Sequence, residues 1–198
     1  TACRRILTTL YRLASAEDPL PAYTEDLVAS PAHAALALEA AEKSAVLLKN
    51  EGVLPWAPGT RLAVLGRLAG LANTGDNGSS RVRARHVVTA LEGLAAVTAV
   101  VSGDESDLDA ARAAAASADA IVVIAGYTAQ EEGEFIPGGM TLGQEAGGGP
   151  RGDIGGDRAD LGLPADTIAL IHAAAATGKP LVVVIVAGSA VLVEGWHE

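Results

Sequence analysis

Short apolar runs without a polar face alternate with helical patterns along most of this chain. Strands are expected at residues 62–66, 98–101, 119–126 and 181–187. Strands that are apolar on both faces are typical of parallel sheets that helices cover on both sides. The sequence therefore predicts an α/β fold, a three-layer αβα sandwich with a mostly parallel sheet.

Helical patterns fill the segments before and between the strands. The predicted helical segments are residues 1–12, 30–52, 87–94, 108–118 and 164–177. Ser30 suits an N-cap and Pro31 suits the first helical position, so a helix is expected to begin there and to end within residues 49–52. Residues 14–29 contain two prolines and show no helical period, which indicates a linker.

Composition limits the classes of partner. A length of 198 residues is enough for one domain with a substantial core. The formal net charge of −10 argues against nucleic acid and against an anionic membrane surface. The single cysteine, Cys3, excludes an internal disulfide, and no histidine has metal-ligand spacing with another, so no metal and no cofactor are predicted. No apolar run approaches the roughly 18 residues of a membrane span, which predicts a soluble protein, cytoplasmic or secreted.

Three carboxylates follow the strand at residues 119–126. Glu131, Glu132 and Glu134 fall within four residues. Ligands of open α/β sheets bind at the carboxyl ends of the strands, and crowded carboxylates resist ionisation, which favours proton donors. The pattern predicts acid/base chemistry on a neutral polar substrate, but an ordinary solvated acidic loop explains the same spacing equally well.

Two further loops carry polar groups. Residues 73–80 follow the first strand and include Asp76 and Asn77, which suit the wall of a polar ligand site, although composition favours an ordinary turn. Asp157 and Arg158 are predicted to form a local ion pair that closes the glycine-rich segment 133–157. A nucleotide site is a weaker alternative, because residues 66–70 lack the third glycine of a dinucleotide-binding motif.

Several motifs occur together in an order that resembles glycoside hydrolase family 3, the β-glucosidase and β-xylosidase family. They are Ala41–Pro55, Gly75–Ser80 with 87–94, 119–126 with Glu132-Gly133, Gly156–Arg158 with Leu163-Pro164, and Lys179–Gly188. The resemblance covers nearly the whole chain and lies with the family's second domain, an αβα sandwich.

The resemblance implies a role in a retaining β-glycosidase that hydrolyses terminal β-D-glucosides. In this family a (β/α)-barrel supplies an Asp nucleophile and the sandwich supplies a Glu general acid/base. The motif places that acid/base at Glu132, directly before Gly133. It implies that Glu131 and Glu134 keep the pKa of Glu132 raised.

Other roles follow from the same resemblance. Asp76 and Asn77 would line the aglycone side, and Asp157 and Arg158 would support the acid/base loop. Residues 1–29 are expected to be the end of a barrel helix and an interdomain linker. Residues 30–198 are expected to be the sandwich domain, incomplete at its C-terminus.

The expected partners are a β-glucoside or related small carbohydrate and the barrel domain, which this chain does not contain. The isolated chain is therefore expected to be inactive. A surface that would face the barrel also suggests a homo-oligomer. The alternative function is a non-catalytic carbohydrate-binding or interaction domain.

Overall fold

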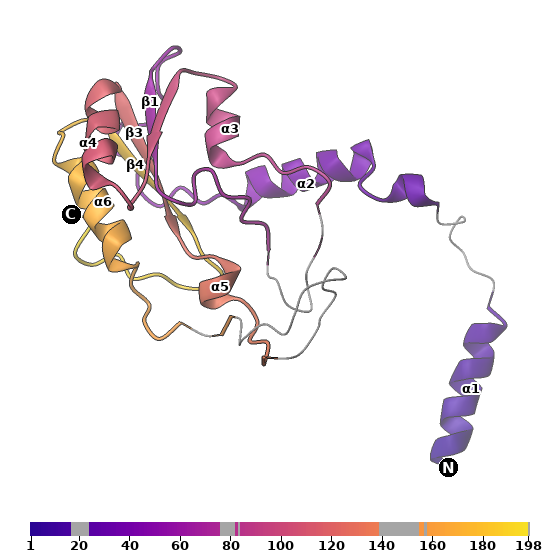
Figure 1. Cartoon of the computed structure of the whole chain (residues 1–198). Helices are drawn as coiled ribbons and strands as arrows, with labels where there is room; N and C mark the ends of the chain where they lie inside the picture. Colours follow the sequence, from indigo (N-terminus) through magenta and orange to yellow (C-terminus); the bar gives the residue numbers. More distant parts are fainter. Residues whose placement is uncertain (17–23, 76–81, 83, 139–154, 157, 198) are drawn as a thin grey trace. The chain divides into compact units, whose positions relative to one another are not determined.

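The computed structural model describes residues 1–16, 24–75, 82, 84–138, 155–156 and 158–197. The chain forms two compact units, Thr1–Leu47 and Leu48–Glu198. The first unit contains α1 (Ala2–Ala14), the 3-10 helix η1 (Glu25–Leu27) and α2 (Pro31–Ser44) (Figure 1). No residue of these three helices is buried. The domain boundary expected between residues 29 and 30 stays a prediction.

Helix α2 begins where the sequence predicts but ends earlier. The Ser30 side chain accepts a hydrogen bond of 3.3 Å from the His33 N–H, and Pro31 takes the first helical position. The prediction that this helix reaches residues 49–52 was wrong. The amide side chain of Asn50 bonds both the N–H and the C=O of Leu54, at 3.0 and 2.9 Å, so this segment forms a turn.

The second unit is built on a four-stranded sheet with the order β2-β1-β3-β4. The strands are β1 (Leu62–Leu65), β2 (Val100–Gly103), β3 (Ala120–Gly126) and β4 (Leu181–Val186). β1 pairs with β2 and β3, β3 pairs with β4, and all three pairings are parallel. These strands confirm the predicted parallel sheet.

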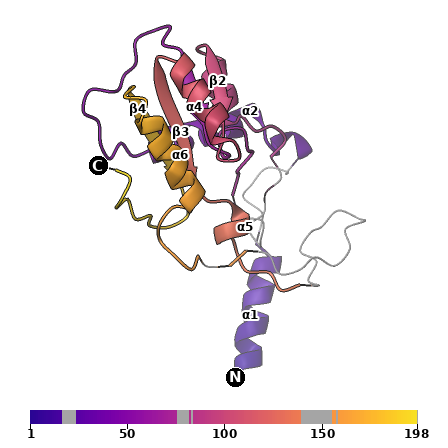
Figure 2. The ribbon, with the colours of Figure 1, turned by 60° about the vertical axis from the view of Figure 1, so that its left-hand side comes forward.

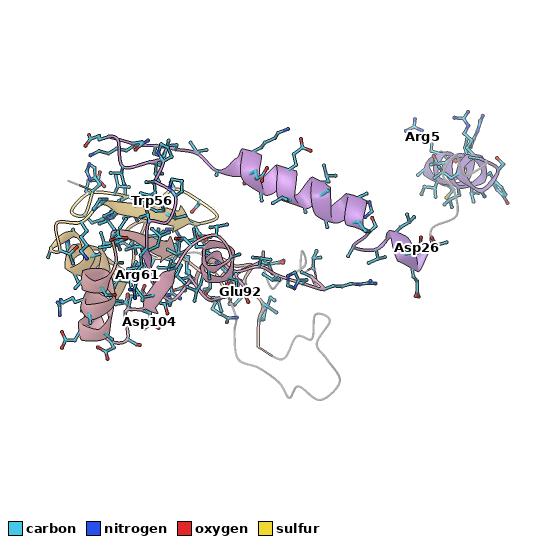
Figure 3. All side chains as sticks on the ribbon, turned by 90° about the horizontal axis from the view of Figure 1, so that it is seen from above. Arg5, Asp26, Trp56, Arg61, Glu92 and Asp104 are labelled. Atoms are coloured by element: carbon cyan, nitrogen blue, oxygen red, sulfur yellow. The ribbon has the colours of Figure 1, made fainter. Side chains whose placement is uncertain are left out.

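Helices cover both faces of this sheet. Alternate residues of a strand face opposite sides, so β1 and β3 contribute to two separate cores. Helices α4 (Leu108–Ser117) and α6 (Ala165–Ala175) pack on one face (Figure 2), and α3 (Ala90–Ala95) packs on the other. Trp56 lies with the α3 face (Figure 3). The three-layer αβα arrangement is therefore confirmed.

Both cores are made from small and branched side chains. The α4–α6 face buries Leu65, Ile121, Val123, Leu170 and Ile171, and the α3 face buries Leu62, Val64, Val122 and Ile124. No helix of the described residues is both long enough and apolar enough to cross a membrane.

Local details differ from the prediction at several places. Helix α3 begins at Ala90 rather than at residue 87, because Thr89 and Glu92 form a capping box at its start. Strand β2 begins at Val100 rather than at residue 98. The acidic segment was predicted to be a loop, but it contains the short helix α5 (Ala129–Glu132), which a second capping box begins at Thr128.

Two glycines allow a close approach of backbones at the edge of the sheet where β1 and β3 end. Gly126 ends β3 with a φ of +135°, and a Cβ there would lie 1.8 Å from the carbonyl oxygen of Val186 in β4. Gly66 follows β1 with a φ of +102°, and a Cβ there would lie 2.4 Å from the Ile124 carbonyl oxygen. Only glycine fits where the backbones approach this closely.

We expect Gly126→Ala to lower the free energy of unfolding by about 3 kcal/mol or more, through backbone strain and overpacking against β4. The matched control is Gly178→Ala, which also has a positive φ, +68°, but has no atom within 4 Å of its Cβ position. This control is expected to lose only about 1 kcal/mol. Urea unfolding of both variants makes the comparison, and equal losses would contradict the close approach at Gly126.

Candidate active site

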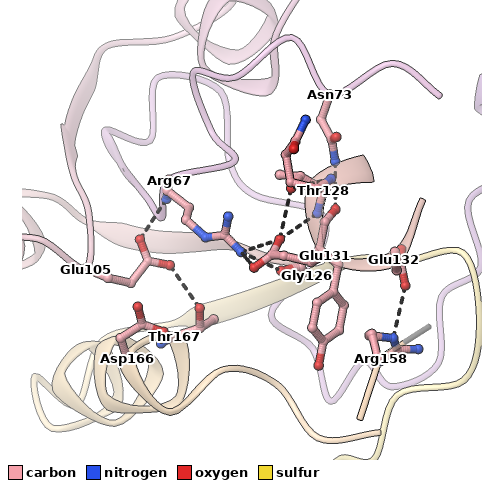
Figure 4. A network of polar contacts seen from close by, with 12 residues as sticks. Arg67, Asn73, Glu105, Gly126, Thr128, Glu131, Glu132, Arg158, Asp166 and Thr167 are labelled. Atoms are coloured by element: carbon pink, nitrogen blue, oxygen red, sulfur yellow. Dashed lines mark hydrogen bonds and ion pairs between the residues drawn. The ribbon is translucent and has the colours of Figure 1, made fainter. Parts of the chain in front are cut away.

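The carboxyl ends of the parallel strands meet at one edge of the sheet, and polar side chains gather there (Figure 4). Arg67 follows β1, and Glu105 follows β2. Glu131 and Glu132 lie on α5, directly after β3, and Gly188 follows β4. This is the edge at which the sequence predicts a ligand site.

Helix α5 carries the candidate acid/base and has only four residues. The Thr128 N–H donates to Glu131 Oε2 at 2.8 Å, and the Gln130 N–H donates to Thr128 Oγ1 at 3.3 Å. A helix this short has no stability of its own. Its position therefore depends on the contacts that its side chains make with the rest of the unit.

Glu131 is bound to Arg67. Arg67 Nη2 donates to Glu131 Oε1 at 2.7 Å and to Oε2 at 2.9 Å, and both side chains are about one-third exposed, 34% and 33%. Partial burial raises the pKa of Glu131, but the hydrogen bond from Arg67, the Thr128 N–H and the arginine charge together outweigh it, so the pKa lies below its usual value. Glu131 is ionised at neutral pH.

Glu132 contacts different residues from those that Glu131 contacts. The Gly188 N–H donates to Glu132 Oε1 at 2.6 Å, and Arg158 Nε lies 3.1 Å from Oε2. The side chains are nearly enclosed, with 15% of Glu132 and 6% of Arg158 exposed. The Glu132 carboxyl is thus held between the end of β4 and a buried guanidinium.

Arg158 is itself fixed by several groups. Its guanidinium lies 4.2 Å from the centroid of the Tyr127 ring, and Nη2 donates to Ser189 Oγ and, at 2.9 Å, to the Ala190 carbonyl oxygen. The local ion pair predicted for it involves Asp157, which lies outside the described residues. Among the residues that the structure describes, the acidic partner of Arg158 is Glu132.

The other residues that the sequence predicts for the site are not part of this enclosed group or lie outside the described residues. Glu134 is exposed, and Asp76 and Asn77 lie outside the described residues. The raised pKa expected for Glu132 stays a prediction. Among the residues that the structure describes, no group of three or more His, Cys, Asp or Glu side chains is placed to hold a metal ion.

Sequence reasoning missed a second set of residues at this edge. The Arg67 N–H donates to Glu105 Oε2 at 2.8 Å, and Thr167 Oγ1 donates to Glu105 Oε1 at 3.1 Å. Asn73 belongs to the loop for which the sequence suggests a ligand-site wall, and its Nδ2 donates to the Tyr127 carbonyl oxygen at 2.9 Å. The available signal was an arginine two residues after a strand, since such a cation lies at the same edge as the acidic segment.

We expect Glu131→Gln to destabilise the fold by about 0.5–1 kcal/mol at pH 7, the range for partly exposed ion pairs. Glutamine still fits the capping box, so the variant mainly removes the charge that Arg67 contacts. The lowered pKa of Glu131 means that its stabilisation is complete above its unfolded pKa, about 4.3, and is lost as pH falls through the lower folded value.

Urea unfolding between pH 7 and pH 2.5 tests this. The difference between wild type and Glu131→Gln should shrink toward the acid end. Asp109→Asn is the control, because Asp109 pairs with Arg112 on an exposed helix surface at 2.8 Å. That control should change stability by less than about 0.5 kcal/mol. A difference at Glu131 that does not depend on pH would contradict the role of the charge.

Comparison with known proteins identifies the family. Residues 45–198 match the family model described as the Glycosyl hydrolase family 3 C-terminal domain. A β-glucosidase of Rhizobium radiobacter is 38% identical over 97 residues, which cover 48% of this chain and 12% of that protein.

Solved structures agree in fold. A GH3 β-glucosidase of Bifidobacterium adolescentis matches with a TM-score of 0.65 and 29% identity, over 93% of this chain and 25% of that one. The β-glucosidase EmGH1 of Erythrobacter marinus matches with a TM-score of 0.61 and 27% identity, over 81% of this chain and 24% of that one. The chain thus spans about a quarter of these solved relatives. Because the family model matches most of its length, the chain belongs to glycoside hydrolase family 3, through the C-terminal domain of that family.

Proposed function

We propose that this chain supplies the general acid/base of a retaining β-glycosidase that hydrolyses terminal β-D-glucosides, and that Glu132 is the acid/base. The observation that carries the proposal is the position of this carboxyl, directly after the central strand at the ligand-binding edge of a family 3 domain. The β-glucosidases among the relatives support glucosides as the substrate class.

The proposed reaction requires a second carboxylate. Retaining glycosidases hold two carboxyl groups roughly 5–5.5 Å apart, one as nucleophile and one as acid/base. We assign the nucleophile to an Asp on a (β/α)-barrel domain, in keeping with the greater length of the relatives. Asp76 and Asn77 would line the aglycone side, and Glu131, Glu134, Asp157 and Arg158 would support the loop.

Glu132 would act twice in this reaction. In the first step its protonated carboxyl gives a proton to the glycosidic oxygen while the Asp attacks the anomeric carbon and the aglycone leaves. In the second step the Glu132 carboxylate takes a proton from water, which attacks the same carbon and frees the Asp. In the structure the Glu132 carboxyl is paired with Arg158, so this contact has to open for the carboxyl to reach the glycosidic oxygen.

In the complete glycosidase, we expect Glu132→Ala to slow substrates with poor leaving groups by about 10²–10⁴-fold, the usual contribution of a general acid. Activated aryl glucosides need little protonation, so their glycosylation step should be much less affected. Steady-state kinetics over a series of aryl β-glucosides measures the difference, and azide should restore turnover by replacing water as the nucleophile. An equal loss for good and poor leaving groups would count against Glu132.

The isolated 198-residue chain is expected to show no turnover of an aryl β-glucoside, because an acid without a nucleophile cannot form the glycosyl intermediate. Turnover by this chain that disappears in Glu132→Gln would disprove the need for a barrel. Calorimetric binding of a glucoside without turnover would instead favour the alternative, a non-catalytic carbohydrate-binding domain.

A further inference from the structure

We propose that Arg67 is a positioning residue for this reaction, because its guanidinium holds α5 at the sheet edge while Glu132 exchanges its own contacts. The inference rests on the proposed function, since it takes Glu132 as the group that transfers the proton. Arg67 acts through Glu131 and is not expected to touch the substrate.

The guanidinium of Arg67 spans the connection between β3 and α5. Its Nη2 donates to both oxygens of Glu131, the third residue of α5, and lies 3.3 Å from the carbonyl oxygen of Gly126, the last residue of β3. One group therefore fixes the end of the central strand and the helix that follows it (Figure 4).

The backbone of Arg67 provides a fixed base for this contact. Gly66, directly before it, packs so closely on β3 that a Cβ would lie 2.4 Å from the Ile124 carbonyl oxygen. The Arg67 N–H donates to Glu105, which also accepts a hydrogen bond from Thr167, a residue only 1% exposed on α6. Displacing Arg67 would therefore disturb β1, the loop after β2 and α6 together.

The remaining contacts of α5 explain why this one matters. Glu132 Oε1 accepts a hydrogen bond from the Gly188 N–H, and Oε2 is enclosed and forms an ion pair with Arg158 without a hydrogen bond. To reach a glycosidic oxygen, the enclosed carboxyl has to move out of these contacts, and α5 then loses an attachment. The contact between Arg67 and Glu131 does not involve the reacting carboxyl and stays in place through the reaction.

The ionisation of Glu131 supports the same division of roles. Its lowered pKa keeps it charged over the pH range in which a general acid has to gain and lose a proton. The attachment to Arg67 therefore does not change when the protonation state of Glu132 changes.

The test uses Arg67→Met and Arg67→Lys in the complete glycosidase, with Arg112→Met as the control for loss of an exposed arginine ion pair. Arg67→Met should lower kcat about ten- to hundredfold on poor leaving groups, because small displacements of a catalytic group are costly. Its KM should stay within about twofold of wild type, and Arg67→Lys should recover part of kcat, since it keeps the charge but not the planar donor. Arg112→Met should match wild type.

A double-mutant cycle with Glu131→Gln gives the second readout. If Arg67 acts through Glu131, Arg67→Met should cost much less in kcat when Glu131→Gln is already present. Additive losses, an equal loss of kcat on all leaving groups, or a change confined to KM would each overturn the positioning role. Should Arg67→Met not fold, Arg67→Lys is judged by the same criteria.

The two proposals fail in different ways. If the rate loss of Glu132→Ala does not depend on the leaving group, the proposed function is wrong, and the inference for Arg67 is wrong with it. If Glu132→Ala behaves as expected while both Arg67 variants match wild type, the proposed function stands and the inference for Arg67 alone is wrong.

Discussion

The pairing of β3 between β1 and β4 is the constraint on which the second unit depends. All seven residues of β3 are buried, and its backbone is bonded on both sides, so little freedom is left in where it ends. The strand ends at Gly126. A residue with a Cβ does not fit at this position, because the carbonyl oxygen of Val186 lies too close. This strand end sets where α5 begins, and the contacts of Glu131 and Glu132 then hold the helix in place.

Two arginines bind neighbouring glutamates of the acidic segment: Arg67 binds Glu131, and Arg158 binds Glu132. Arg67 binds Glu131, whose lowered pKa keeps this ion pair charged at neutral pH. Arg158 binds the nearly enclosed Glu132, where a buried charge without a partner would be strongly destabilising. The neighbouring residues Glu131 and Glu132 thus have separate partners, because Glu131 meets the residue that follows β1 and Glu132 meets the residues beyond the end of β4.

The sequence predicted the layers well, because a run such as residues 119–126 is apolar on both faces only in a covered parallel sheet. It predicted the ends of helices less well, because side-chain hydrogen bonds to the backbone compete with helix formation. The Asn50 side chain, for example, bonds the backbone of Leu54 beyond the end of α2. The acidic segment attracted attention by its composition, but Arg67 did not. Its place two residues after a strand indicates the same sheet edge, but its partner Glu131 is 64 residues away, and the sequence does not show which acidic side chain it meets there.

The proposed function also gives the enclosure of Glu132 a consequence for the reaction. Its carboxyl contacts the Gly188 N–H and Arg158, and its Oε2 atom is enclosed, so the side chain has to leave these contacts to reach a glycosidic oxygen. Arg158 is held independently by the Tyr127 ring and the Ala190 carbonyl oxygen, so the guanidinium stays in place while the carboxyl moves. In the proposed reaction the Glu132 carboxylate therefore has a fixed cation to return to between the two proton transfers.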